Sequence, residues 1–158
     1  MPNQKPADLG LLILRLSIGP MLFVGHAMVK LSQIGTNAAG NFIPVLGLTP
    51  ELSHFFAAMF EGVGAILIIL GLFTRLSAFA LTVFMSVAAF IATANSSFYP
   101  QWLPSSISEY KTLMTPFKEY PLLYCSVFLS LTFSGAGKFS IDNKIKYRLP
   151  YFLKFFCS

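Results

Sequence analysis

Long apolar blocks alternate along this chain with short polar or Pro/Gly-rich joints. The blocks cover residues 8–31, 50–73, 76–94 and 116–135. A helix needs about 20 residues to cross the roughly 30 Å hydrocarbon core of a bilayer, because each residue adds about 1.5 Å. The pattern therefore predicts an all-α integral membrane protein, a four-helix transmembrane bundle that forms a single domain over residues 1–158. A soluble core of very apolar helices is the alternative.

Local signals support the boundaries of these blocks. Thr49 followed by Pro50 is typical of a helix start, and the last block opens with the same Thr-Pro pair. That block closes at "SGAGK", where glycine can adopt the left-handed backbone that ends a helix. The first block follows a short polar start, is long and contains Arg15. We therefore expect a retained first helix rather than a cleaved signal peptide.

The composition is typical of a membrane protein, and the distribution of cations predicts how the spans are oriented. Of the 158 residues, 55% are hydrophobic and 11% are charged, whereas soluble domains carry about 25% charged residues. An even number of spans places both termini on one side, and most cations would lie there: Lys5, Arg75, Lys138, Lys144, Lys146, Arg148 and Lys154. Lys111 and Lys118 would lie opposite, with Lys30 near that rim. The positive-inside rule then makes the terminal side cytoplasmic.

Two further segments have characteristic compositions. The tail, residues 138–158, alternates basic and bulky apolar residues, so we expect it to lie on the anionic inner leaflet of the bilayer; a partner-docking helix is the alternative. The connection 95–115 carries Tyr99, Trp102 and Tyr110 between prolines. It predicts a belt of interfacial aromatics, with a lid over a site as the alternative. Basic residues are not interleaved with aromatics as in base-stacking surfaces, so nucleic acid is not an expected partner.

Polar side chains form a stripe on each of the first two predicted helices. At about 100° per residue, Arg15, His26 and Lys30 fall on one face of the first. The second has a stripe at spacings of three and four, formed by Glu51, His54, Ala58, Glu61 and Ala65. A charge at bilayer depth costs about 2.5–3.5 kcal/mol on insertion scales. We therefore expect the two stripes to face each other.

Antiparallel packing predicts which of these residues meet. Counting about 1.5 Å per residue from the cytoplasmic end places Lys30 level with Glu51 and His26 level with His54. Glu61 then lies almost within reach of Arg15, which makes Arg15–Glu61 the deepest expected pair. Such a seam could bind an amphipathic small molecule or handle protons. An ion pair that only fixes helix register is the alternative.

Other candidate chemistry is weaker. Two histidines at one height could ligate a metal or haem, but no third ligand is expected there, so we expect neither group. Cys125 and Cys157 form no C-x-x-C motif, which argues against a built-in dithiol centre. Glu119 would stand at the outer mouth as a ligand-binding candidate, although a carboxylate there is more often solvated or paired with Lys118. The sequence contains no nucleotide-binding loop, zinc motif or nucleophile elbow, and it does not establish catalysis.

Three stretches resemble successive motifs of the DoxX family of small membrane proteins: "LRLSIGPMLFVGHAMVKL", "FEGVGAILIILGLFTRLSAFALTVFMSVAAF" and "EYPLLYCSVFLSLTFSGAGKFSID". The resemblance covers about residues 9–142 and implies a four-helix transmembrane bundle. It places the family's polar motif positions on Arg15, His26, Lys30, Glu61, Arg75, Glu119 and Asp142. Relatives often carry a histidine where this chain has Thr93, and that departure weakens a histidine-based cofactor hypothesis.

The resemblance also implies a role. The name of the DoxX family is tied to quinone-reducing subunits of thiosulfate oxidation, and some relatives are linked to membrane-associated thiol-stress complexes. It implies a bacterial-type cytoplasmic (inner) membrane protein, a redox-associated auxiliary subunit that binds a quinone-like molecule in the polar seam. No intrinsic cofactor is predicted, so electrons would come from a soluble redox enzyme as partner. The alternatives are a non-catalytic scaffold or assembly factor, and a small-solute or ion transporter acting as a homo-oligomer.

Overall fold

The structure is a computed structural model of the chain, and it describes residues 5–92, 118–145 and 147. Within these ranges every regular element is a helix. The elements are α1 (Lys5–Leu22), η1 (Phe23–Ala27), α2 (Met28–Ser32), α3 (Asn37–Gly40), α4 (Pro50–Leu70), α5 (Thr74–Val87), η2 (Ala88–Ala92), α7 (Glu119–Ser134) and α8 (Ile141–Ile145).

Three helices of the described part are long and apolar enough to cross a membrane: Lys5–Ser32, Pro50–Leu70 and Thr74–Ile91. They correspond to the first three predicted blocks, with ends shifted by a few residues. The last block is represented by α7, which has 16 residues. Residues 93–117 lie outside the described part, and with them the predicted loop 95–115, Thr93 and the expected helix start at Pro116. The structure therefore shows an all-α protein with three candidate spans.

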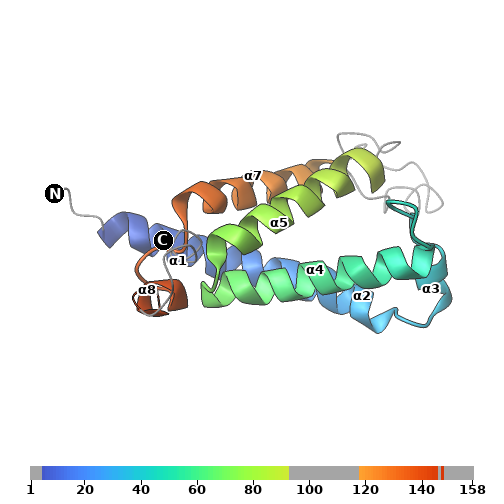
Figure 1. The fold of residues 1–158 in the computed structure, drawn as a ribbon, viewed down its shortest axis with the longest axis horizontal. Helices are drawn as coiled ribbons and strands as arrows, with labels where there is room; N and C mark the ends of the chain where they lie inside the picture. Colours follow the sequence, from blue (N-terminus) through green and yellow to red (C-terminus); the bar gives the residue numbers. More distant parts are fainter. Residues whose placement is uncertain (1–4, 93–117, 146, 148–158) are drawn as a thin grey trace, which may run out of the picture.

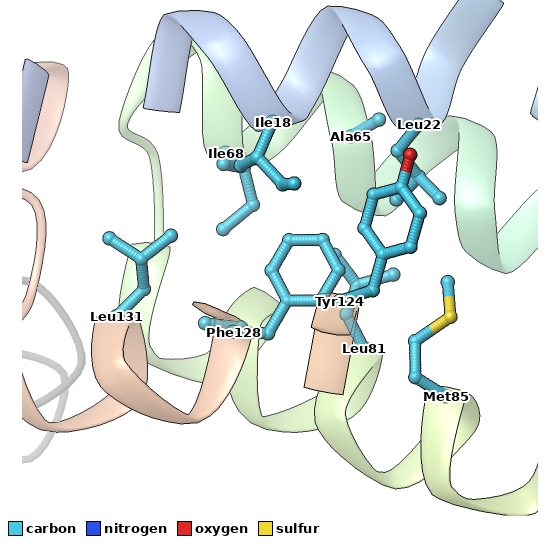
Figure 2. Packing of buried hydrophobic residues seen from close by; sticks show 10 residues of the cluster. Ile18, Leu22, Ala65, Ile68, Leu81, Met85, Tyr124, Phe128 and Leu131 are labelled. Carbon is cyan, nitrogen blue, oxygen red and sulfur yellow. The ribbon is translucent and has the colours of Figure 1, made fainter. Parts of the chain in front are cut away.

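The long helices pack around one apolar core. α4 lies along α1, α5 leads back from the end of α4, and α7 lies beside α5 (Figure 1). Each of the four contributes residues to the core: Ile18 and Leu22, Ala65 and Ile68, Ala78, Leu81 and Met85, and Tyr124, Phe128 and Leu131 (Figure 2). The opposite faces expose large apolar side chains, including Leu16, Phe60 and Phe79. Apolar residues on both faces are typical of helices surrounded by lipid.

The predicted start of α4 is confirmed, whereas the helix ends at Leu70, three residues before the predicted Phe73. The Thr49 hydroxyl accepts a hydrogen bond from the Leu52 N–H at 3.4 Å, and Pro50 occupies the first turn. Gly71 ends the helix in the left-handed conformation, with φ +65°. α5 then begins at Thr74, two residues earlier than expected. In "SGAGK", Gly135 and Gly137 both have positive φ, but Gly135, which ends α7, has ψ −164° and so does not adopt the left-handed helical conformation that the sequence predicted.

A π-helical turn at Phe23–Ala27 interrupts the first span, whereas the sequence predicted a regular helix. An extra residue in one turn rotates everything after it by about 100°. Buried positions consequently step by five residues, from Leu22 to Ala27, instead of three or four. The rotation brings Ala27 against Gly62 of α4. Small residues at this contact let the two backbones approach closely.

Several chain segments gather at one end of the bundle. The carboxylate of Asp8 in α1 accepts a hydrogen bond from the Lys138 N–H at 3.0 Å and lies 3.6 Å from its ammonium group. Asp142 of α8 contacts the turn between α4 and α5. α1 begins well beyond the end of α4 (Figure 1). The described members of the predicted cationic side lie on these segments: Lys5, Arg75, Lys138 and Lys144; Lys146, Arg148 and Lys154 lie outside the described residues.

Candidate functional site

Buried charged side chains form two separate clusters. The Arg15–Asp142 cluster comprises these two residues and the turn at Gly71. The Lys30–Glu61 cluster comprises the following side chains: His26, Lys30, His54, Glu61 and Tyr124. The two clusters differ in what satisfies their charges. Each leaves a buried charged side chain with one atom unpartnered among the described residues, the donor Nε of Arg15 in the first and the acceptor Oε2 of Glu61 in the second.

Arg15 donates hydrogen bonds to the last carbonyl groups of α4. The guanidinium is fully buried, and its Nη1 donates to the carbonyls of Ile68 and Ile69, each at 3.2 Å. Its Nη2 donates to the Phe139 carbonyl at 2.5 Å. The last carbonyls of a helix have no partner within the helix, and a cation is favourable there. Arg15 therefore joins α1 to the end of α4 and to the segment before α8.

Asp142 satisfies the start of α5. Its two carboxylate oxygens accept from the N–H groups of Phe73 and Thr74, at 2.7 and 2.8 Å. Its own N–H donates to the Gly71 carbonyl at 2.8 Å, and its charge attracts Arg15. Asp142 is 1% exposed. Asp142 thus anchors α8 to the bundle. The position of the tail on the leaflet stays a prediction, and residues 148–158 are outside the described part.

Gly71 is required at the centre of this cluster. Its positive φ is one that side chains rarely adopt, and a Cβ there would overlap the Arg15 guanidinium and the Ser140 side chain. Phe73 also has a positive φ, +46°. Its N–H is held by Asp142, which stabilises the tight turn between α4 and α5.

Glu61 pairs with Lys30. The Lys30 ammonium lies 2.5 Å from Oε1, with the two side chains 19% and 4% exposed. The predicted Arg15–Glu61 pair is therefore wrong, and so is the predicted Lys30–Glu51 pairing. Glu51 is exposed on the first turn of α4 and forms no ion pair with the residues that the structure describes. The expectation that Arg15 and Glu61 both face inward is confirmed.

The direction of helical side chains explains these partners. Long side chains on a helix point back toward its N-terminus. In two antiparallel helices, Lys30 and Glu61 consequently lean toward each other, whereas Arg15 leans away from Glu61. The helices are also offset from the predicted register by between one and two turns, since Gly19 lies against Ala65 and Ile69.

The two histidines have different neighbours. The His26 ring lies edge-on to Tyr124 of α7, with centroids 5.5 Å apart. His54 is hydrogen-bonded through Nε2 to Gln33 Oε1 at 3.3 Å, and its ring packs on Phe42. Both lie within the electrostatic influence of Glu61 and Lys30. Within the described ranges, no group of three His, Cys, Asp or Glu side chains could hold a metal ion.

Two buried polar atoms of this cluster have no partner among the described residues. Oε2 of Glu61 and Nδ1 of His54 are buried and form no hydrogen bond with any described residue. Such groups are rare in folded proteins because desolvating them without compensation is unfavourable. Tyr124 contributes a hydroxyl on the same side, and Figure 2 shows it directed toward α1.

The remaining candidates lie outside both clusters. Glu119 is exposed at the start of α7. Cys125 is half-buried, with Sγ 3.3 Å from the Ser86 hydroxyl; Cys157 lies beyond the described residues. Sequence reasoning missed two features here. The first is the contact of Asp142 with the start of α5, which was missed because the segment around Asp142 is mostly basic. The second is the π-helical turn, for which the five-residue step between the buried positions Leu22 and Ala27 was the available signal.

Comparison with known proteins points to one family. The DoxX family model matches residues 10–94, which contain both Lys30 and Glu61. An uncharacterised protein from Haemophilus influenzae is 34% identical over 126 residues, covering 78% of this chain and 81% of that protein. No solved structure matches the chain.

Proposed function

The chain belongs to the DoxX family of multi-pass membrane proteins, and from that premise we propose that the Lys30–Glu61 cluster binds a lipid-soluble molecule with a polar head. A quinone-like molecule, as the quinone or its hydroquinone, is the first candidate. The observation that carries the proposal is the buried carboxylate of Glu61. One oxygen holds Lys30, and the other has no partner in the part of the chain that the structure describes. Ionisable groups at bilayer depth are usually kept for a task.

The cluster offers complementary groups for such a head. Lys30 has two N–H donors beyond the one that Glu61 accepts, and His26 can donate from its ring. These groups could donate to an oxygen of the polar head. Glu61 would orient Lys30 or hold a proton. The ring of Tyr124 and the adjoining apolar core suit an aromatic head and its tail.

The electrons of any redox step would come from a partner. The chain needs no intrinsic cofactor under this proposal, because it serves as the membrane component that binds the lipid-soluble molecule. A soluble redox enzyme would supply or accept the electrons at the membrane surface. The exposed cations at the terminal end, such as Lys138, would face that enzyme and the anionic leaflet.

The fold also supports a topology. We take α7 as the fourth span, lengthened by residues before Glu119. The spans would then place both termini on the side that carries Lys5, Arg75, Lys138 and Lys144. By the positive-inside rule this side is cytoplasmic, and the membrane is a bacterial-type inner membrane.

A scaffold is the second candidate. It is favoured by the Arg15–Asp142 cluster, whose side-chain contacts are made to backbone groups and serve to join helices. Under this alternative the Lys30–Glu61 pair would likewise only fix the packing of α1 on α4.

Mass spectrometry of bound lipids separates the two candidates. The protein would be purified in mild detergent and its extract compared between wild type, Glu61→Gln and the matched control Glu51→Gln. Ligand binding predicts a lipophilic compound at near-stoichiometric amount in wild type and in Glu51→Gln, and its loss in Glu61→Gln. An extract that contains only bulk phospholipid in all three would favour the scaffold.

A further inference from the structure

Glu61 presents an acceptor to whatever occupies the cluster. Its Oε1 accepts from the Lys30 ammonium, and Oε2 is buried without a partner among the described residues. The residue is 3% exposed, so bulk water reaches it poorly. A carboxylate that pairs with an ammonium group accepts hydrogen bonds at both oxygens and donates none. The group that best satisfies Oε2 therefore brings a hydrogen.

The second unpartnered atom, Nδ1 of His54, also favours a hydrogen-bond donor as its partner. When Nε2 of His54 donates to Gln33 Oε1, Nδ1 carries no hydrogen and becomes an acceptor. Both open positions of the cluster consequently favour a donor. The donor-only ammonium of Lys30 lies next to the acceptor-only carboxylate of Glu61. A hydroxyl suits this arrangement because it can accept from Lys30 while it donates to Glu61, whereas a carbonyl can only accept.

We propose that the Lys30–Glu61 cluster selects a phenolic hydroxyl, as in a hydroquinone or alkylphenol, over the corresponding carbonyl or ether. This inference rests on the proposed lipid-soluble ligand and names its chemical class. The aromatic ring of such a ligand would lie near His26 and Tyr124, which already pack edge to face. The Lys30 side chain is 19% exposed, so a ligand could reach its ammonium group from outside the bundle.

A pair of probes that differ only in the donor tests this selection. Wild-type protein in nanodiscs would be titrated with 4-nonylphenol and with its methyl ether by isothermal calorimetry, with empty nanodiscs subtracted for partitioning into lipid. The phenol should bind at least about tenfold more tightly, because the ether leaves Oε2 unpaired. Equal affinity, or tighter binding of the ether, would overturn the inference.

Two variants then show which residue is responsible for the preference for the phenol. Glu61→Gln should reduce the preference to about twofold, since an amide can donate as well as accept, and Glu51→Gln should keep the full preference. A preference that survives Glu61→Gln in folded protein would place the phenol elsewhere and overturn the inference. The wild-type comparison needs no variant, so poor folding of Glu61→Gln leaves it decisive. Binding of both probes without preference sinks this inference alone, whereas binding of neither also sinks the proposed function.

Discussion

The two charged clusters satisfy buried charge in different ways. At Arg15 and Asp142 the side chains are hydrogen-bonded to main-chain groups at the end of α4, the start of α5 and the segment before α8. At Lys30 and Glu61 the two side chains pair with each other, and Oε2 of Glu61 has no partner among the described residues. A charge that caps helix termini can move only if the helices move, whereas a charge held by a side chain can exchange its partner.

This contrast separates residues that hold the fold from residues that can do chemistry. Composition alone does not separate them, because both clusters contain a cation and a buried acid. What differs is the kind of partner and the kind of unpartnered atom among the described residues: a donor, Arg15 Nε, in the first cluster and an acceptor, Glu61 Oε2, in the second. The predictions below change one cluster at a time, so that stability and ligand binding can be read independently.

The largest effect is expected for Arg15→Met. The substitution removes three hydrogen bonds from buried carbonyls and leaves Asp142 without its neighbouring cation. Removing one member of a buried charged network destabilises by about 3–5 kcal/mol. Thermal unfolding of the detergent-solubilised protein measures it. A variant that melts with wild type would show that the carbonyls are satisfied in another way.

Asp142→Asn should have the next largest effect. The amide keeps one acceptor for the start of α5 but loses the second acceptor and the charge beside Arg15. We expect a loss of about 2 kcal/mol, the combined size of a helix cap and a charged hydrogen bond. Asn143→Ala, at the neighbouring and less buried position, serves as the control in the same unfolding assay and should change much less. Equal losses in the two variants would mean that α8, rather than the carboxylate, matters.

A smaller effect is expected for the coupling between Lys30 and Glu61. A double-mutant cycle with Lys30→Met and Glu61→Leu should give an interaction free energy of about 1–2 kcal/mol, because the pair is in contact and partly buried. The same cycle between Arg15 and Glu61 should be additive within about 0.5 kcal/mol. Strong coupling in the second cycle would restore the pairing predicted from the sequence.

The smallest effect is expected for Glu51→Gln. Glu51 is exposed and forms no ion pair with the described residues, so its stability should stay within about 0.5 kcal/mol of wild type. Ligand retention should also be unchanged. A clear loss of either property would return Glu51 to the site.

The long-range pattern of the fold could be predicted from the sequence. Block lengths predicted the helices, the Thr49-Pro50 pair predicted the start of α4, and spacings of three and four predicted its buried face. His54, Ala58, Glu61 and Ala65 are all buried there. These features depend on local sequence and on the width of a bilayer, which are both visible without a structure.

The partners within the seam could not be predicted. Height counting assumes that the helices begin in a common plane, but α1 extends past the end of α4 so that Arg15 can reach its last carbonyls. It also treats side chains as points, although Lys30 and Glu61 lean toward each other. Asp142 was missed as a partner because helix-end contacts between distant segments leave no periodic signal.

The central claim is that the Arg15–Asp142 cluster holds the fold while the Lys30–Glu61 cluster holds the ligand. Two measurements on two variants test this claim directly. Mass spectrometry gives the amount of lipophilic compound bound per folded protein, and thermal unfolding gives the melting temperature. The double variant Lys30→Met/Glu61→Leu should melt close to wild type, since an apolar pair can replace a buried ion pair, and should lose the ligand. Asp142→Asn should melt lower and keep it. A loss of ligand that follows melting temperature in both variants would contradict the account.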